Sequence, residues 1–204
     1  MYITCLDLEG VLVPEIWIAF SEESGIPELR RTTRDEPDYN KLMNWRLGIL
    51  KEHGLGLKEI QDTIAKIDPM PGAKEFMDEL RQLCQVVILS DTFTQFALPL
   101  MRKLGMPSIF CNELIVGKDG MITGFKMRQE NGKFHAVKAL QSIGFKTIAS
   151  GDSFNDLAMI KQSQAGFLFR APEHIIKDNP DVKAFTEYSQ LLDAIKKTIA
   201  EENA

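Results

Sequence analysis

The first residues that suggest chemistry are two carboxylates, Asp7 and Glu9, in the sequence Asp7-Leu-Glu-Gly10. They end an apolar segment that we expect to be a strand, and carboxylates at positions i and i+2 of an extended chain project to the same side. Two acids placed in this way can face one reacting centre, and Gly10 lets the chain turn sharply away after them. A solvated junction between a strand and a loop is the alternative interpretation of this motif taken alone.

A second acidic group, Asp152, Asn155 and Asp156, follows another apolar segment in Gly151-Asp-Ser-Phe-Asn-Asp156. Open α/β sheets bind ligands at the carboxyl ends of their strands, so we expect the two acidic motifs to meet at one edge. Mg²⁺ prefers carboxylate, carbonyl and water oxygens, and the two motifs together predict a magnesium site. Asn155 and Asp156 are equally consistent with ordinary helix capping.

Two further motifs carry groups that can bind an anion. Ser90, Asp91 and Thr92 end a third apolar segment, and a hydroxyl with adjacent backbone N–H groups at such a junction can hold phosphate oxygens. Lys133 comes just before a predicted helix, where its ammonium group could neutralise charge on a nucleophile and on a phosphoryl group. A helix cap at Ser90 to Thr92 and a solvated lysine at a helix start are the simpler interpretations.

These motifs need a scaffold of strands and helices to position them. Short apolar segments alternate with stretches whose apolar residues recur three or four positions apart, which is typical of a parallel sheet covered by helices on both faces. The predicted strands are Tyr2–Leu8, Gln85–Ser90, Lys146–Ser150 and Ala165–Phe169, and the predicted helices are Lys74–Leu83, Thr94–Leu104, Phe134–Ile143, Asn155–Lys161 and Ser189–Glu201. The predicted fold class is therefore α/β, with a doubly wound, mainly parallel (Rossmann-like) sheet.

Two segments interrupt the alternation. Residues 14–68 show helical periodicity throughout and are predicted to form an inserted helical cap, which the turn Pro69-Met-Pro-Gly72 closes. Residues 113–127 contain Lys118-Asp-Gly120 between two apolar stretches, which predicts a β-hairpin. The expected organisation is a core domain of residues 1–13 and 69–204, the inserted cap, and the hairpin within the core.

The composition of the 204 residues excludes several classes of protein. Hydrophobic residues make up 44% of the chain, which is enough to bury a core. A net charge of −5 gives no broad basic surface, so we expect no binding to nucleic acid or to an anionic membrane. The N-terminus does not read as a signal peptide and no apolar run could span a bilayer, which makes the cytoplasm the expected location. The three cysteines lack the spacing of a zinc site, and we expect them to be reduced.

The motifs at Asp7, Ser90, Lys133 and Asp152 occur in the order of the four motifs of the haloacid dehalogenase superfamily, which the sequence resembles from residue 3 to residue 156. This resemblance implies that Asp7 attacks phosphorus and forms an aspartyl-phosphate. It also implies that Asp7, Asp152 and the backbone carbonyl of Glu9 bind Mg²⁺. The side chain of Glu9 would act first as general acid and then as general base.

The same resemblance implies supporting roles for other residues. Asp156 would support the metal through water or orient Lys133. Ser90 would hydrogen-bond the transferred phosphoryl group, with Asp91 and Thr92 beside it in the phosphate-binding motif.

Two departures from the common superfamily pattern narrow the resemblance. Most phosphatases of the superfamily have Asp at the position of Glu9, and phosphoserine phosphatases tend to have Gly-Gly where this chain has Asp91-Thr92. Both departures, together with residues 5–20, 86–93 and 151–156, resemble the bifunctional phosphoserine phosphatase/homoserine phosphotransferase subfamily. This resemblance implies hydrolysis of L-phosphoserine and phosphoryl transfer to L-homoserine, in serine and threonine biosynthesis. The carboxylate of Asp91 would repel phosphate unless its side chain points away.

An amino-acid substrate requires a cation for its carboxylate and an anion for its ammonium group, and arginine suits a carboxylate well. Arg46 and Glu15 lie at positions that resemble the substrate-binding Arg and Glu of phosphoserine phosphatases, and Asn155 is a third candidate for substrate binding. A solvated helix face for Arg46 and a helix cap for Glu15 are the simpler interpretations.

Three other functions are consistent with parts of the pattern. A phosphoacceptor receiver domain uses similar residues, but the long insertion at residues 14–68 argues against it. A catalytically silent binding protein would not need intact Asp7, Asp152 and Lys133. A phosphatase for another small phosphomonoester remains open, and Glu15 and Arg46 are the residues that discriminate it from a phosphoserine phosphatase. A homodimer is the oligomeric state expected for a metabolic enzyme.

Overall fold

The computed structural model describes residues 1–32, 35, 36 and 38–201 of the chain. Its strands are β1 (Tyr2–Leu6), β2 (Gln85–Phe93), β3 (Ser108–Val116), β4 (Ile122–Lys126), β5 (Lys146–Gly151), β6 (Ala165–Phe169) and β7 (Lys183–Phe185). Its α-helices are α1 (Ile16–Ser24), α2 (Tyr39–Glu52), α3 (Leu57–Ile64), α4 (Ala73–Leu83), α5 (Thr94–Lys103), α6 (Gly132–Ser142), α7 (Leu157–Gln162), α8 (Glu173–Asp178) and α9 (Tyr188–Glu201). Two short 3-10 helices are η1 (Pro27–Arg30) and η2 (Phe154–Asp156).

A mainly parallel sheet forms the centre of the molecule, with the strand order β4-β3-β2-β1-β5-β6-β7. Neighbouring strands are parallel except for β3 and β4. Leu6 of β1 is aligned with Ile88 of β2 and with Ser150 of β5, so these strands approach one edge of the sheet together. The chain order reverses at β1, which is the place where doubly wound sheets bind ligands. The predicted fold class is confirmed.

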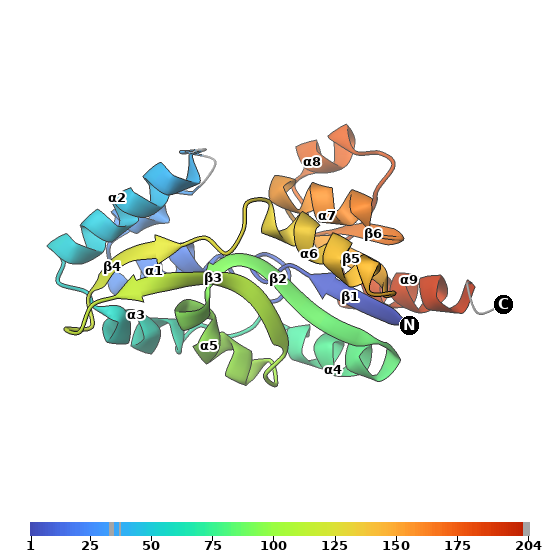
Figure 1. Cartoon of the computed structure of the whole chain (residues 1–204), viewed down its shortest axis with the longest axis horizontal. Coiled ribbons are helices and arrows are strands. Elements are labelled where there is room, and N and C mark those ends of the chain that lie inside the picture. Colours follow the sequence, from blue (N-terminus) through green and yellow to red (C-terminus); the bar gives the residue numbers. More distant parts are fainter. Residues whose placement is uncertain (33–34, 37, 202–204) are drawn as a thin grey trace.

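Helices cover both faces of this sheet (Figure 1). Leu6 and Ile88 belong to the hydrophobic cluster under α4, α5 and α9, whereas Ile3, Cys5 and Val87 belong to the cluster under α6, α7 and α8. The assignment to two faces follows the period-2 alternation of side chains along a strand. Each fully buried side chain of this size stabilises the fold by about 1.5–3 kcal/mol, so both faces hold the strands in place.

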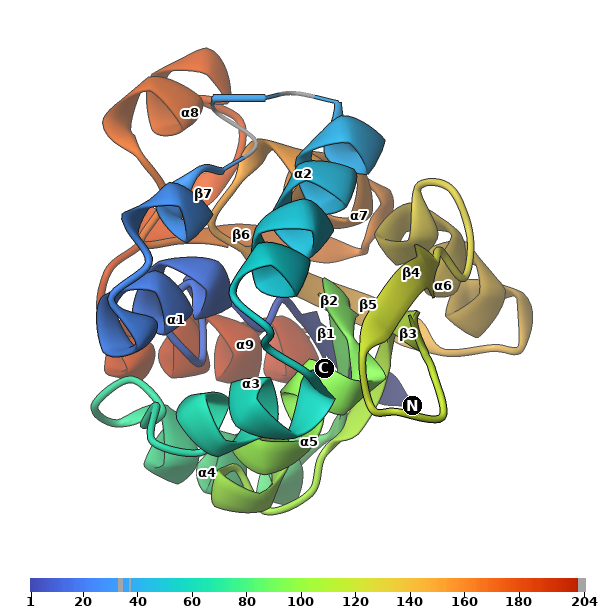
Figure 2. The same ribbon diagram turned by 90° about the vertical axis from the view of Figure 1, so that its left-hand side faces the viewer.

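The helical segment 14–68 lies beyond the end of the core towards which β1 runs, as Figures 1 and 2 show. It contains α1, η1, α2 and α3, and its described residues form no strand. Its two connections to the core lie side by side, because Met70 N donates a hydrogen bond to Leu12 O at 2.9 Å. The hydroxyl of Tyr188 in α9 donates to Val11 O at 2.6 Å, which holds the first connection against the core.

The predicted β-hairpin is present, but its first strand is longer than predicted. β3 begins at Ser108 because its first half pairs in parallel with β2, and its second half pairs with β4. Gly120 has a φ of 84° in the turn, as the Asp-Gly sequence predicts. Phe125 of β4 packs edge-on against Tyr39 of α2, and Leu57 N donates to Gly120 O at 2.9 Å. The hairpin therefore links the core sheet to the helical segment.

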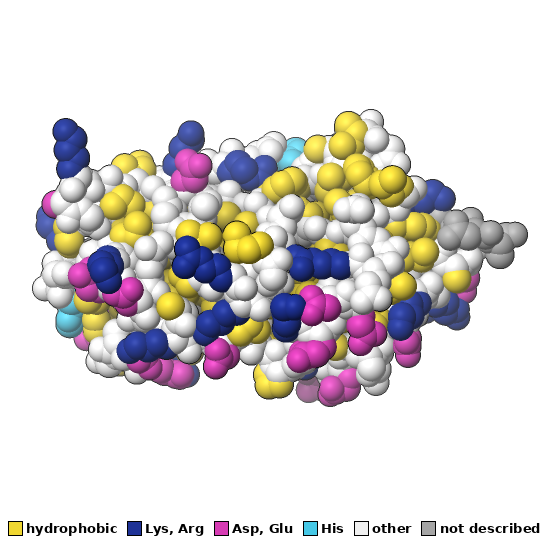
Figure 3. Space-filling view, turned by 90° about the horizontal axis from the view of Figure 1, so that it is seen from below, with side chains coloured by type: hydrophobic (Ala, Val, Ile, Leu, Met, Phe, Trp, Pro, Cys, Tyr) yellow, Lys and Arg dark blue, Asp and Glu magenta, His cyan; other side chains and the backbone are white. Residues whose placement is uncertain are grey.

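Other elements also differ from the prediction. β2 continues to Phe93, and the short elements α8 and β7 were not predicted, because six and three residues are too few to show a clear period. No helix among the described residues is both long and apolar enough to cross a membrane. On the face shown in Figure 3, lysine and arginine side chains are interspersed with aspartate and glutamate.

Candidate active site

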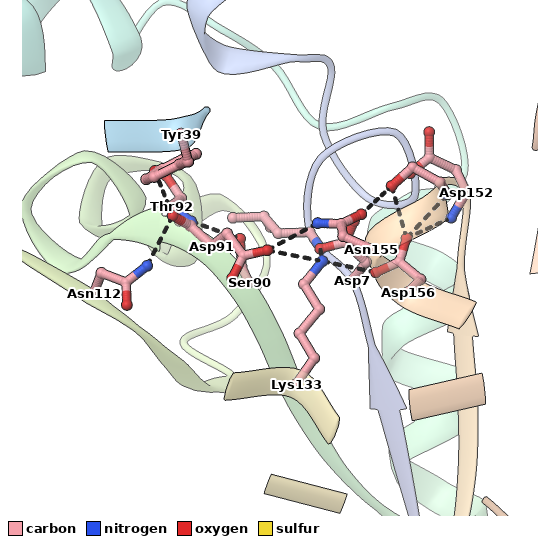
Figure 4. A network of polar contacts seen from close by, with 12 residues as sticks. Asp7, Tyr39, Ser90, Asp91, Thr92, Asn112, Lys133, Asp152, Asn155 and Asp156 are labelled. Atoms are coloured by element: carbon pink, nitrogen blue, oxygen red, sulfur yellow. Dashed lines mark hydrogen bonds and ion pairs between the residues drawn. The ribbon is translucent and has the colours of Figure 1, made fainter. Parts of the chain in front are cut away.

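Asp7 follows β1 directly, and only 7% of its side chain is exposed. Its Oδ1 accepts hydrogen bonds from Leu8 N and from the ammonium group of Lys133, both at 2.8 Å. Lys133 lies in the first turn of α6 and also donates to Asp156 Oδ1 at 2.7 Å. Figure 4 shows the ammonium group between the two carboxylates. With 5% of its side chain exposed, Lys133 is not the solvated lysine of the simpler interpretation.

Asp152 and Asp156 complete an acidic cluster with Asp7. One carboxylate oxygen from each of the three residues lies within 4.8 Å of the others. Asp156 Oδ2 accepts hydrogen bonds from the backbone N–H groups of Asp152, at 3.1 Å, and Ser153, at 3.0 Å. The protein thus uses both oxygens of Asp156 to hold Lys133 and the loop after β5. The carboxylates of Asp7 and Asp152 provide the oxygen ligands that Mg²⁺ prefers.

The protonation behaviour of these carboxylates also fits a cation. Burial, followed by the charge of Asp156, raises the pKa of Asp7 well above its usual value, although Lys133 opposes this effect. The same two causes raise the pKa of Asp152 to about 7. Burial disfavours the charge on Lys133, but Asp156 and Asp7 outweigh it and raise the pKa of the lysine. One ammonium group cannot balance three clustered carboxylates, and a divalent cation would stabilise their charged forms.

The glycines of the two acidic motifs permit this close approach. Gly10 has a φ of +76°, and a Cβ atom there would lie 2.5 Å from the carboxyl carbon of Asp152. A Cβ atom on Gly151 would lie 2.2 Å from the carboxyl carbon of Asp156. A side chain at either position would displace a carboxylate of the cluster.

The predicted phosphate-binding residues Ser90, Asp91 and Thr92 lie in an irregular part of β2. The pairing of β2 with β3 shifts between Leu89 and Phe93, and Ser90 Oγ accepts a hydrogen bond from Thr92 N at 3.2 Å. The interpretation of these three residues as a helix cap is wrong, because the strand continues past them and Phe93 occupies the N-cap of α5. The irregularity places them beside the acidic cluster (Figure 4).

Two residues missed by the sequence analysis hold this part of β2. The hydroxyl of Tyr39 donates to Asp91 O at 3.1 Å, and Asn112 Nδ2 donates to the same oxygen at 3.0 Å. Asn112 Oδ1 in turn accepts from Arg128 N at 3.0 Å. A buried asparagine inside an apolar strand was a usable signal for Asn112, but nothing in the sequence marks Tyr39. Tyr39 therefore connects the helical segment to the predicted phosphate site.

The side chain of Asp91 does not point away from the site. Asp91 Oδ2 accepts a hydrogen bond from Asn155 Nδ2 at 2.8 Å and lies 3.9 Å from Lys133 Nζ. Figure 4 shows this carboxylate reaching from β2 towards Lys133 and Asn155. Asn155 lies in η2, so it joins the second acidic motif to the Ser-Asp-Thr motif.

Glu9 contacts the start of α1. Its Oε2 accepts a hydrogen bond from Ile16 N at 2.8 Å, which satisfies one of the free N–H groups at the helix start. Burial, followed by the charge of Glu15, raises the pKa of Glu9 to about 7. A carboxyl group with this pKa can both give and take a proton near neutral pH.

Arg46 is buried, with 5% of the residue exposed, so the interpretation of a solvated helix face is wrong. Its guanidinium group stacks on the ring of Trp17 at 4.4 Å, and Nη2 donates to Arg31 O at 2.8 Å. Its Nε is buried and has no hydrogen-bond partner among the described residues. Burial lowers the pKa of Arg46 to about 10, which leaves the guanidinium charged. A buried cation with an unused donor can bind an anionic group.

Glu15 occupies the N-cap position of α1, but its side chain makes no capping hydrogen bond. The simpler interpretation is thus right about the position of Glu15 at the helix start, but the side chain does not cap the helix. Glu15 is exposed, and its charge raises the pKa values of Glu9 and Asp152 and favours the charged form of Arg46. Glu15 thus lies within electrostatic reach of both the acidic cluster and Arg46.

Comparisons with known proteins agree with this arrangement. Residues 5–164 match the family model of haloacid dehalogenase-like hydrolases. The chain is 51% identical over 191 residues to "Phosphoserine phosphatase ThrH" of Pseudomonas aeruginosa, which covers 94% of this chain and 93% of that protein. It is 50% identical to "Phosphoserine phosphatase" of Pseudomonas syringae pv. tomato, over 93% of this chain and 80% of that protein.

A solved structure titled "Phospho-Aspartyl Intermediate Analogue of Phosphoserine phosphatase" shares the fold, with a TM-score of 0.77 and 25% identity. The match covers 95% of this chain and 98% of that one. The family match spans the strand end with Asp7, the Ser-Asp-Thr motif, Lys133 and the loop with Asp152. The chain is therefore an enzyme that belongs to the haloacid dehalogenase-like hydrolase family.

Proposed function

We propose that this enzyme is a Mg²⁺-dependent phosphotransferase that hydrolyses L-phosphoserine and transfers its phosphoryl group to L-homoserine. The observation that carries the proposal is the buried carboxylate of Asp7, which Lys133 holds at 2.8 Å beside two further aspartates. The 51% identity to a phosphoserine phosphatase over 94% of the chain supports the substrate.

In the proposed reaction, an oxygen of Asp7 attacks phosphorus while the bond from phosphorus to the serine oxygen breaks. Glu9 protonates the departing oxygen, for which its pKa of about 7 is suitable. Glu9 then takes a proton from water or from the hydroxyl of homoserine as that oxygen attacks the aspartyl-phosphate and releases Asp7. Lys133 and Ser90 stabilise the phosphoryl oxygens in both steps.

Asp7, Asp152 and the backbone carbonyl of Glu9 would hold Mg²⁺, which neutralises phosphoryl charge when it is bound. The two carboxylates lie close enough to share one ion. Asp156 acts through its neighbours, because its oxygens hold Lys133 and the backbone of the loop that carries Asp152.

Arg46 and Glu15 would select an amino acid as substrate. The unused buried Nε of Arg46 offers a hydrogen bond to the substrate carboxylate, and Glu15 offers a negative charge to its ammonium group. Asn155, whose amide lies beside Asp91, would be a third contact to the phosphoserine. Stacking on Trp17 fixes the plane of the guanidinium group before the substrate arrives.

Phosphorus NMR tests the proposed reaction directly. The purified protein is incubated with L-phosphoserine and Mg²⁺, with and without L-homoserine, and with a chelator as control. We expect inorganic phosphate in the first sample and O-phosphohomoserine in addition in the second. Phosphate alone would refute the transferase reaction. Turnover that the chelator does not stop would refute the dependence on Mg²⁺, and the absence of turnover would refute the substrate.

The variant Arg46→Lys tests the recognition of the amino acid. Loss of a charge-assisted hydrogen bond costs about 1.5–3 kcal/mol, which predicts a rise in KM for phosphoserine of about 10- to 100-fold. Hydrolysis of p-nitrophenyl phosphate, which has no carboxylate, should be unchanged. Arg30→Lys is the matched control, because Arg30 is exposed and pairs with Glu22. An equal loss on both substrates would contradict the role of Arg46.

A further inference from the structure

The carboxylate of Asp91 lies among the groups that are expected to bind a phosphoryl group. It accepts a hydrogen bond from Asn155 Nδ2 at 2.8 Å and lies 3.9 Å from the ammonium group of Lys133. Lys133 is also 2.8 Å from Asp7, the proposed site of phosphoryl attachment. An anion next to Asp7 would therefore share the charge of Lys133 with the carboxylate of Asp91, which already accepts a hydrogen bond from Asn155.

The backbone of Asp91 is held by two hydrogen bonds, whereas its side chain is held by one, from Asn155. Two donors, the hydroxyl of Tyr39 and the amide of Asn112, bind the carbonyl oxygen of Asp91. The side chain is 41% exposed, so water can solvate the carboxylate when it leaves Asn155. A rotation of this side chain can thus open the donors without a change in the strand.

We infer that the carboxylate of Asp91 is an internal competitor of the phosphoryl group. It binds Asn155 and lies beside Lys133, and it repels a phosphate at close range after the phosphate has displaced it. This inference rests on the proposed function, because it assumes that a phosphoryl group binds beside Asp7. Its consequence is weak binding of inorganic phosphate, which favours release of this product after hydrolysis.

The repulsion gives the inference a measurable size. A phosphate of charge about −1.5 and a carboxylate about 5 Å away repel each other enough to weaken binding by about tenfold, even at the dielectric constant of water. The partial exposure of Asp91 places the repulsion near this lower limit. Removal of the charge should therefore lower the Kd for inorganic phosphate by about tenfold, with the asparagine still able to accept from Asn155.

The test is titration calorimetry of inorganic phosphate into the Mg²⁺-loaded enzyme. The variants are Asp91→Asn, which removes the charge, and Asp91→Glu, which keeps it. Asp193→Asn is the matched control, because Asp193 is exposed on α9 and the same charge is removed there. Thermal unfolding of each variant shows that it is folded before the titration.

We expect a Kd about tenfold lower for Asp91→Asn, and values within about threefold of wild type for Asp91→Glu and Asp193→Asn. Unchanged or weaker phosphate binding by Asp91→Asn would overturn the inference. Equal tightening in Asp91→Glu would also overturn it, because the charge would then not be the cause. Failure of the wild-type enzyme to hydrolyse phosphoserine would refute the proposed function instead, since phosphate binding is measured without any turnover.

Discussion

Replacement of Gly10 by alanine should have two effects that can be measured separately, one on the Mg²⁺ requirement and one on the free energy of unfolding. Gly10 has a φ of +76°, a conformation that costs an L-residue about 1–2 kcal/mol. Its new Cβ atom would lie 2.5 Å from the carboxyl carbon of Asp152, whereas ordinary contact begins at 3.4 Å. The carboxylate therefore has to move by about 1 Å, the difference between these two distances.

This displacement affects a proposed ligand of Mg²⁺. Changes next to a metal ligand typically reduce metal affinity by about 10- to 100-fold, so we expect Gly10→Ala to need at least about tenfold more Mg²⁺ for half-maximal activity. The measurement is the Mg²⁺ dependence of phosphoserine hydrolysis, together with urea unfolding in the presence of a chelator. The unfolding experiment should show a loss of about 1–2 kcal/mol from the backbone alone.

Gly144→Ala is the control for backbone strain. Gly144 has a φ of +92°, and a Cβ atom there would meet no other atom within 4 Å. We expect this variant to lose similar stability and to keep the Mg²⁺ requirement of the wild type. Equal Mg²⁺ requirements in the two variants would refute the argument that a contact with Asp152 makes glycine necessary at position 10.

Two further predictions concern the polar network. Lys133→Met leaves the buried carboxylates of Asp7 and Asp156 without their ammonium partner, and urea unfolding with a chelator should show a loss of about 3–5 kcal/mol. Added Mg²⁺ should restore part of this loss, and an unchanged unfolding midpoint would contradict the pairing. Tyr39→Phe removes one of two hydrogen bonds to Asp91 O, worth about 0.5–1.5 kcal/mol, and should lower kcat/KM for phosphoserine by about 2- to 10-fold. Wild-type kinetics in this variant would show that the contact from the helical segment is not needed for catalysis.

The sheet could be predicted from the sequence because the alternation of apolar segments and helical periodicity is repeated along the chain. Ala165–Phe169 was predicted with its observed bounds, and the other predicted strands differ only at their ends. A buried parallel strand is a continuous apolar run, which is easily recognised. Short elements such as β7 and α8 have no such signal, and the first half of β3 was missed because its pairing with β2 depends on distant residues.

The sequence predicted the site only in part. The sequence predicted that Asp7, Lys133, Asp152 and Asp156 meet, and the structure brings them together. It could not predict the direction of the Asp91 side chain, because that direction depends on Asn155, a residue distant in sequence. The roles of individual residues, the domain boundaries, a homodimer and a location in the cytoplasm stay predictions.

The paired connections of the helical segment make it separable from the core. A backbone hydrogen bond joins Leu12 and Met70, so the segment 14–68 leaves the core and returns to it at one place. In this respect the segment resembles a long surface loop. The entropy of closing such a loop rises only with the logarithm of its length, so segments of other lengths can be exchanged at this point. The residues of the proposed phosphoryl chemistry lie at the strand ends, while Arg46 and Glu15, two of the proposed contacts to the amino acid, lie in the exchangeable part. Chimeras made at these two positions would keep the reaction centre only if the new segment supplies the contacts that Ile16 N makes to Glu9 and that the Tyr39 hydroxyl makes to Asp91 O.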